Sequence, residues 1–280
     1  MGDLRQGHIS RRRFLKHALL GVAGATLLDF RVGLADAPYG PFKVGVQSFS
    51  LRNFDRAKML QLTAQMGLRY LEAYRKHIPI TTDQAQIRAL LAELKQANIK
   101  LISFGVVGFG KNAQQNRAAF EFAKAMGIET LTANPRQESL NQLDELVDEF
   151  QINIAIHNHG PRALYDKIED TLKAMEGRNK RIGACVDTGH YMRSNEDPLE
   201  AIKAFGDRIY GVHLKDLDEN NKFAELGKGK LDLEGCLRAL AAQKMSGCLA
   251  IEYEEHPENP VPYIEQYLAV LRETIAKLKL

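Results

Sequence analysis

Four residues of types that bind metals or transfer protons each close a short apolar run of this 280-residue chain: His157, Asp187, His213 and Glu252. The runs are INIAIHNHG, RIGACVDTGH, IYGVHLKD and CLAIEYEE, and a segment with helical character follows each of them. In a parallel β/α barrel the C-terminal ends of the strands meet at one face, where the chemistry takes place. The pattern therefore predicts that the four side chains meet around one divalent cation.

The donor types narrow the choice of cation. Two imidazoles and two carboxylates form a mixed nitrogen and oxygen set, which suits manganese, zinc, iron, cobalt or nickel better than calcium or magnesium. Manganese is the first expectation. Each residue also has an ordinary interpretation: a surface hydrogen bond for either histidine, a turn at Asp187 and a salt bridge for Glu252. The metal interpretation is favoured because four successive strands present suitable groups at the same level.

Alternation along each strand adds further groups to this face, since residues two apart point the same way. Lys215 shares a face with His213, and His159 shares a face with His157. His190 and His159 are expected either to contact the substrate or to support the metal ligands. The residues expected to bind substrate are His159, Glu72, Gln47 and Lys228.

The elements that must position these side chains alternate along the chain. Strands are expected at 43–48, 69–74, 99–105, 129–133, 152–157, 182–187, 208–214 and 247–253. Helices are expected at 55–66, 83–97, 112–126, 139–150, 163–176, 198–205, 232–243 and 260–278. Eight such pairs with short connections predict an α/β fold, a single closed (β/α)8 TIM barrel. An open dinucleotide-binding sheet is disfavoured because no GxGxxG follows the first strand. The irregular stretch 216–231 is expected to lie over the active site.

A separate signal precedes the barrel. Residues 10–16 read SRRRFLK, which fits the twin-arginine export motif S-R-R-x-F-L-K, and the apolar run 18–28 is too short to span a bilayer. We expect residues 1–35 to be a signal peptide cleaved after Ala35 and residues 36–280 to form the barrel. The expected location is the periplasm, with the twin-arginine translocase as a partner during export and no stable membrane insertion after cleavage. A basic helix or a retained anchor is the alternative.

Charge and cysteine content exclude other classes of protein. Residues 1–35 carry a net charge of +4 and the whole chain +3, so the mature part carries about −1. This near-neutral balance does not favour nucleic acid as a partner. Cys185, Cys236 and Cys248 lie in apolar contexts, and their odd number favours buried free thiols over a disulfide.

The segments VDTGH (186–190), VHLKD (212–216), LGKGKLDL (226–233) and IEYE (251–254) resemble the sugar phosphate isomerase/epimerase family, the xylose-isomerase-like barrels. The resemblance covers essentially all of the mature chain. Members include ketose 3-epimerases, inosose dehydratases, hydroxypyruvate isomerases, endonuclease IV-type nucleases and lyases acting on 3-keto-glycosides. The resemblance therefore implies a metal-dependent barrel that acts on a sugar.

The resemblance also implies a ligand set. In the epimerases Glu, Asp, His and Glu from the last four strands bind the metal, and the matching residues here are His157, Asp187, His213 and Glu252. The chain departs from that pattern at His157, where the family often has glutamate. It departs again at Lys228, where related chains commonly carry an acidic residue. The first departure argues against the two-carboxylate mechanism of epimerisation, in which two glutamates face each other across the sugar, because one of the pair would be an imidazole here.

The expected function is that of a metal-dependent sugar isomerase or epimerase that abstracts a proton beside a carbonyl. Glu252 or His157 would transfer the proton, and Lys215 or His190 would protonate a departing oxygen. A lyase acting on a 3-keto-glycoside or an inosose-like substrate is the nearest alternative. A non-catalytic periplasmic sugar-binding protein is another, and a phosphodiesterase is the least favoured. A homo-oligomer remains open.

The export signal gives a direct prediction. Replacing Arg11 and Arg12 with lysine should leave uncleaved precursor in the cytoplasm, because the motif requires the arginine pair. Cell fractionation and immunoblotting measure this. Normal accumulation of the variant in the periplasm would reject the twin-arginine route.

Overall fold

The structure is a computed structural model that describes residues 38–280, which belong to one compact unit. The expected signal peptide and its cleavage point lie outside the described residues. No helix within the described part of the chain is both long and apolar enough to cross a membrane.

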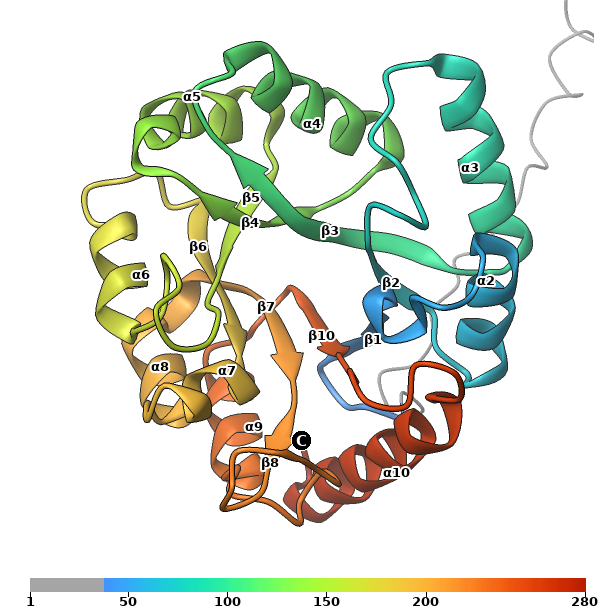
Figure 1. The fold of residues 1–280 in the computed structure, drawn as a ribbon, viewed down its shortest axis with the longest axis vertical. Coiled ribbons are helices and arrows are strands. Elements are labelled where there is room, and N and C mark those ends of the chain that lie inside the picture. Colours follow the sequence, from blue (N-terminus) through green and yellow to red (C-terminus); the bar gives the residue numbers. More distant parts are fainter. Residues whose placement is uncertain (1–37) are drawn as a thin grey trace, which may run out of the picture. The chain divides into compact units, whose positions relative to one another are not determined.

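Eight parallel strands close into a barrel, with the helices outside it (Figure 1). The strands are β1 (Lys43–Gln47), β2 (Tyr70–Ala73), β3 (Lys100–Phe109), β4 (Thr130–Pro135), β5 (Asn153–His157), β6 (Ile182–Asp187), β7 (Ile209–Leu214) and β10 (Cys248–Ile251). Their order around the barrel is β1-β10-β7-β6-β5-β4-β3-β2. The expected (β/α)8 barrel is therefore confirmed. The bounds of most strands differ from the expected ones by one or two residues, and the largest difference is in β3, which continues beyond the expected 99–105 to Phe109.

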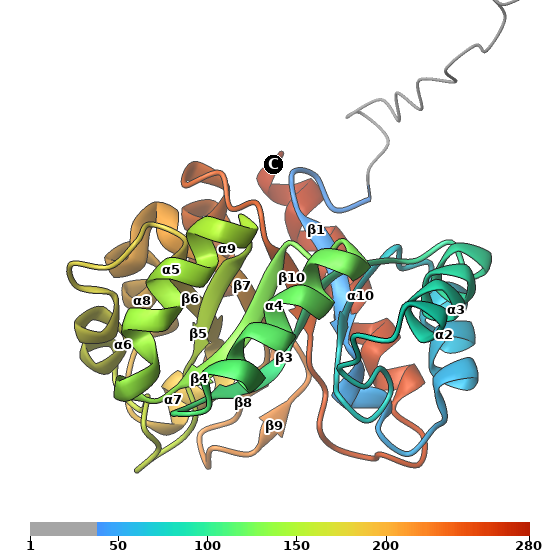
Figure 2. The same ribbon diagram turned by 90° about the horizontal axis from the view of Figure 1, so that it is seen from above.

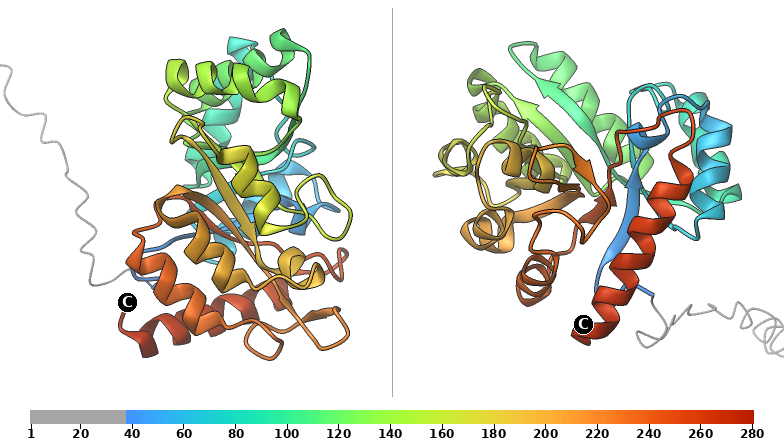
Figure 3. Two further views of the ribbon diagram at one scale, coloured as in Figure 1. Left: turned by 90° about the vertical axis from the view of Figure 1, so that its left-hand side faces the viewer. Right: turned by 60° about the horizontal axis from the view of Figure 1, so that its bottom comes forward.

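The outer ring consists of α2 (Arg56–Gln65), α3 (Gln84–Gln96), α4 (Ala113–Met126), α5 (Leu140–Phe150), α6 (Ile168–Met175), α8 (Pro198–Phe205), α9 (Leu233–Ala242) and α10 (Val261–Leu278). Figure 3 shows α10 running along the outside of β1. The expected helix over 163–176 is shorter, since Asp170 accepts a hydrogen bond from the backbone N–H of Lys167 and caps the helix there. In α3, Ile87, Leu90 and Leu94 face the core and are buried, whereas Leu91 is exposed.

Two structures lie over the C-terminal ends of the strands. A short helix, α7 (Thr188–Arg193), follows β6 directly. The stretch expected to be irregular contains a small antiparallel pair, β8 (Asp216–Leu217) and β9 (Phe223–Ala224), at the same end of the barrel (Figure 2). The buried carboxylate of Asp216 accepts hydrogen bonds from four backbone N–H groups, those of Leu217, Gly227, Gly229 and Leu231. Such charge-assisted bonds fix the loop over the barrel mouth.

The three cysteines are buried and unpaired, as expected. Burial raises the pKa of the Cys185 thiol to about 11, so it is protonated at neutral pH.

Candidate metal centre and active site

The ends of the last four barrel strands bring together His157, Asp187, His213 and Glu252. All four side chains are buried, and one ligand atom from each lies within 4.8 Å of the others. Strand pairing sets this arrangement, because Asp187 on β6 is in register with His213 on β7. The predicted cluster therefore exists as a single group of side chains at the barrel mouth.

The separations between its donor atoms match those of a metal coordination shell. His157 Nε2 lies 2.9 Å from His213 Nδ1 and 3.4 Å from Asp187 Oδ2. His213 Nδ1 lies 3.1 Å from Glu252 Oε2. Two ligands placed ~2.1 Å from a tetrahedral ion are ~3.4 Å apart. One cation can therefore contact all four side chains.

Glu72 fixes the orientation of His213. The Nε2–H of His213 donates to Glu72 Oε1 at 2.9 Å, which directs Nδ1 at the cluster. Gln47 donates to the same carboxylate oxygen and Ser103 to the other, each at 2.9 Å. Burial alone would raise the pKa of Glu72, but His213 and Ser103 outweigh it and lower that pKa. Metal-binding histidines commonly donate their second N–H to a carboxylate in this way.

Asp187 keeps one carboxylate oxygen without a hydrogen bond. Its Oδ1 accepts the backbone N–H of His190 at 2.8 Å, at the start of α7. The side-chain amide of Asn158 donates to the backbone C=O of Asp187 and accepts from the backbone N–H of Asp187. Oδ2 is buried and accepts no hydrogen bond, and it forms an ion pair with Lys215 Nζ at 2.9 Å. A buried carboxylate oxygen that accepts no hydrogen bond can still take a metal cation as a further partner.

The protonation states of His157 and Asp187 suit a cation. Burial lowers the pKa of His157 to about 3 against the opposing effect of Asp187, so the imidazole is neutral at neutral pH. Burial works against ionisation of Asp187, yet His190 and Lys215 hold its pKa well below the usual value. Burial lowers the pKa of His213, but nearby acidic groups, Glu72 and Glu252 among them, outweigh it and raise that pKa, so a metal would have to displace a proton there. The donor set of two imidazoles and two carboxylates fits a first-row divalent ion. The Cys185 thiol also borders the two histidines, but its raised pKa keeps it protonated.

Lys215 is a buried cation beside the cluster. Its ammonium lies 2.8 Å from Glu252 Oε2 and forms an ion pair with Glu254. Burial disfavours this charge, but Asp187, Glu252 and Glu254 outweigh it and raise the pKa of Lys215 above its usual value. Both Glu252 and Glu254 are thus bound to one ammonium.

A pocket of about 270 Å³ opens over the cluster. The sequence-predicted residues that line it are Gln47, His157, His159, His190, Lys215 and Glu252. Glu72, Asp187 and His213 lie beneath them, fully buried. The structure does not bring Lys228 to this pocket, because its side chain is 71% exposed and pairs with Glu225 at 2.6 Å. Contact of Lys228 with substrate stays a prediction.

Sequence reasoning missed other residues of this pocket. Glu254 lines the pocket and forms an ion pair with Lys215. Tyr74 and Arg75 line the same pocket. Strand alternation had placed Glu254 on the face of Glu252, and that signal was sufficient to find it. Tyr74 and Arg75 follow the end of β2 and carry no comparable signal.

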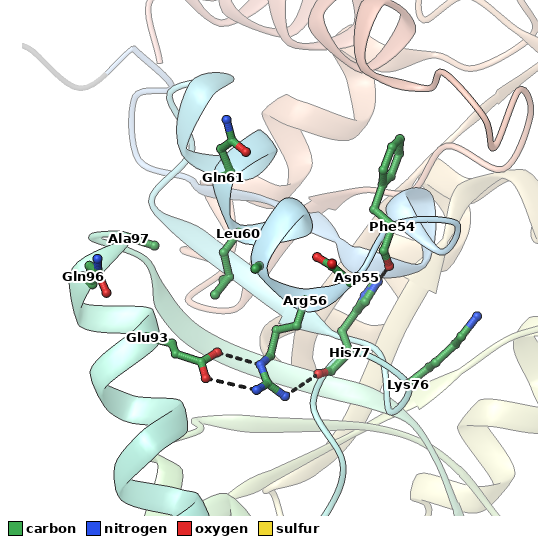
Figure 4. A pocket seen from close by; sticks show the side chains of 11 residues that line it. Phe54, Asp55, Arg56, Leu60, Gln61, Lys76, His77, Glu93, Gln96 and Ala97 are labelled. Carbon is green, nitrogen blue, oxygen red and sulfur yellow. Dashed lines mark hydrogen bonds and ion pairs between the residues drawn. The ribbon is translucent and has the colours of Figure 1, made fainter.

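A larger pocket of about 840 Å³ lies on the outside of the barrel, between α2 and α3 (Figure 4). Its principal polar groups are already paired. Arg56 binds both carboxylate oxygens of Glu93, and the ring nitrogens of His77 contact Ser48 Oγ and the Phe54 carbonyl. The convergent and unsatisfied groups are at the barrel mouth, which is therefore the candidate active site.

Comparison with known proteins shows that this chain is similar to proteins with the same barrel fold. The family model of the xylose isomerase-like TIM barrel matches residues 60–274. An inosose dehydratase from Clostridium botulinum is 31% identical over 145 residues, which cover 44% of this chain and 48% of the relative. The match thus spans about half the length of that curated relative.

Solved structures cover more of the chain. The crystal structure of an uncharacterized protein from Parabacteroides distasonis has a TM-score of 0.67 and 30% identity, covering 83% of this chain and 99% of that one. A structure of L-ribulose 3-epimerase has a TM-score of 0.66 and 16% identity, covering 85% and 96%. The second likeness concerns the fold alone.

The metal centre can be tested by removing ligands. His213→Ala and Asp187→Ala should lose bound divalent metal while the barrel stays folded, because each removes a donor atom. Glu72→Gln should weaken metal binding by ~10–100-fold, since it removes the charge that orients His213. Elemental analysis after dialysis and circular dichroism measure these effects. His256→Ala, at a histidine that is 52% exposed, is the matched control. Full metal content in both alanine variants would reject the assignment.

Proposed function

The chain belongs to the xylose isomerase-like TIM barrel family, and from this premise we propose that it is a metal-dependent sugar lyase. It would abstract a proton beside the carbonyl of a keto-sugar and expel the substituent on the next carbon. Partial similarity to inosose dehydratases supports this reaction class. The buried donor cluster at the barrel mouth supports metal dependence.

The residues that would hold the cation are His157, Asp187, His213 and Glu252. When bound, a divalent cation supplies Lewis-acid polarisation of a substrate carbonyl and so favours loss of the neighbouring proton. The protein's own groups then have to remove that proton, protonate the leaving oxygen and orient the sugar between them.

Glu252 is the proposed base. It is one of two carboxylates that line the catalytic pocket, and burial does not keep it protonated, because Lys215 and His213 lower its pKa. It would take the proton from the carbon beside the carbonyl. The electron pair of that C–H bond becomes a C=C bond as the C–O bond of the next carbon breaks.

Lys215 is the proposed acid. Its side chain lines the same pocket and is charged at neutral pH, as lysine ordinarily is. The ammonium would give a proton to the departing oxygen, which leaves as water or an alcohol. Glu252 and Glu254 hold the ammonium at the pocket, and Thr188 fixes the lysine backbone through hydrogen bonds with its N–H and C=O.

One observation favours elimination over epimerisation. The two carboxylates at the pocket both pair with the Lys215 ammonium, so an acid lies beside the proposed base, as elimination requires. The imidazoles also lie close together, with ring centroids of His157 and His159 4.5 Å apart and those of His159 and His190 5.5 Å apart. A two-carboxylate epimerase requires a base on each face of the sugar. Epimerisation assisted by an imidazole is the second candidate, supported by the similarity of the fold to sugar 3-epimerases.

Proton abstraction is directly measurable. The manganese-loaded enzyme, assayed with inososes, keto-sugars and keto-glycosides in D2O, should incorporate solvent deuterium or release the neighbouring substituent. Glu252→Gln should lower that rate by ~10²–10⁴-fold because it removes the base. Metal content is measured alongside, and Glu255→Gln, at an exposed position of the same loop, is the control. Full activity of metal-free enzyme would reject the mechanism.

His157→Glu separates the two candidate reactions. A second carboxylate can still bind the cation and adds a base on the other face, so elimination should persist within about tenfold and the share of epimerised product should rise. Product analysis by NMR gives both rates. Loss of elimination with metal retained would instead assign a chemical role to the His157 imidazole.

A further inference from the structure

A second pocket, of about 570 Å³, adjoins the catalytic pocket. Val106 and His159 line both, so the two spaces meet at these residues. The catalytic pocket alone, at about 270 Å³, lies below the ~300–1,000 Å³ typical of small-molecule sites, whereas the two together lie within that range. The joint space is therefore larger than the reacting ring of a sugar needs.

The extension of β3 builds this second pocket. Beyond the level at which the neighbouring strand β2 ends, β3 continues beside β4, with Gly108 paired to Asn134 and Phe109 to Pro135. Its wall is thus a paired β-ladder. A site on regular strands holds its groups in place more firmly than a site on loops does.

The chemistry of its lining suits a neutral, hydroxyl-bearing group. The Oδ1 atom of Asn134 is buried without a hydrogen-bond partner, so it can accept from a ligand hydroxyl. The Arg136 guanidinium has no ion-pair partner among residues 38–280 and can donate to ligand oxygens. Leu164, 54% exposed at the rim, offers apolar surface to the face of a ring.

Space for the ligand is kept open by a glycine. A Cβ added at Gly108 would meet no atom within 4 Å, and the backbone there is not in the left-handed region. The protein could accommodate a side chain at this position without strain. Its absence leaves the groove free for a ligand.

We infer that this groove, lined by Asn134, Arg136 and Leu164, is a second subsite that binds a neutral sugar ring attached to the reacting ring. The inference rests on the proposed function and deepens it: the preferred substrate is a glycoside larger than a monosaccharide. The hydroxyls of the second ring donate to Asn134 Oδ1 and accept from Arg136, and its apolar face packs on Leu164.

Binding tests the subsite without turnover. Calorimetry on the manganese-loaded enzyme would compare glucose with maltose and cellobiose. At least one disaccharide should bind about tenfold or more tightly than glucose. Gly108→Leu, which fills the groove, and Asn134→Ala should each reduce that preference, whereas Gln137→Ala, outside the pocket on the same segment, should preserve it. Equal affinity for all three sugars, or no binding of any, would overturn the inference.

Kinetics separate the subsite from the reaction. For a keto-sugar and its keto-glycoside, the ratio of kcat/KM should favour the glycoside by about tenfold or more and fall in Gly108→Leu. Turnover with no preference for the glycoside would reject the subsite and keep the proposed function. Disaccharide preference in binding without any turnover would reject the function and keep the subsite. Stronger binding of a glycoside bearing a carboxylate than of its neutral counterpart would overturn the assignment to a neutral ring.

Discussion

The candidate site depends on one hydrogen bond, from His213 Nε2 to Glu72 Oε1, between two fully buried side chains that are far apart in the sequence. It determines which imidazole nitrogen faces the centre. With Nε2–H committed to the carboxylate, Nδ1 faces His157, Asp187 and Glu252. Gln47 and Ser103 hold the carboxylate in turn, so the first three strands of the barrel position a ligand on the seventh barrel strand.

Charge balance explains why the cluster calls for a cation. Glu72, Asp187 and Glu252 are buried close together, and burying ionised carboxylates is costly unless positive charge compensates. Lys215 supplies one positive charge, which it shares with Glu254 near the surface. A divalent ion would satisfy the remaining acceptor on Asp187 and take the place of the proton that His213 otherwise holds toward His157. With the carboxylates neutralised by that ion, the Lys215 ammonium would be available to the substrate.

The barrel and the four clustered side chains could be predicted from sequence because both depend on local pattern. Each ligand ends an apolar run, and parallel strands align their ends. The hydrogen bond between Glu72 and His213 could not be predicted in this way, because the two residues are 141 positions apart. They meet only when the barrel closes, and no local sequence pattern encodes that closure. The extension of β3 to Phe109 was missed because the glycines at 105, 108 and 110 weaken the strand signal. Lys228 was expected at the substrate because its motif lies near the active site, but its side chain turns outward.

The central claim is that one divalent cation binds among His157, Asp187, His213 and Glu252. Anomalous diffraction from crystals of the manganese-loaded protein, recorded on both sides of the manganese absorption edge, tests it most directly. The account predicts a single strong peak bonded to His157 Nε2, His213 Nδ1 and one oxygen each of Asp187 and Glu252. Full loading in solution with no peak there, or a peak bound instead by His159 and His190, would contradict it.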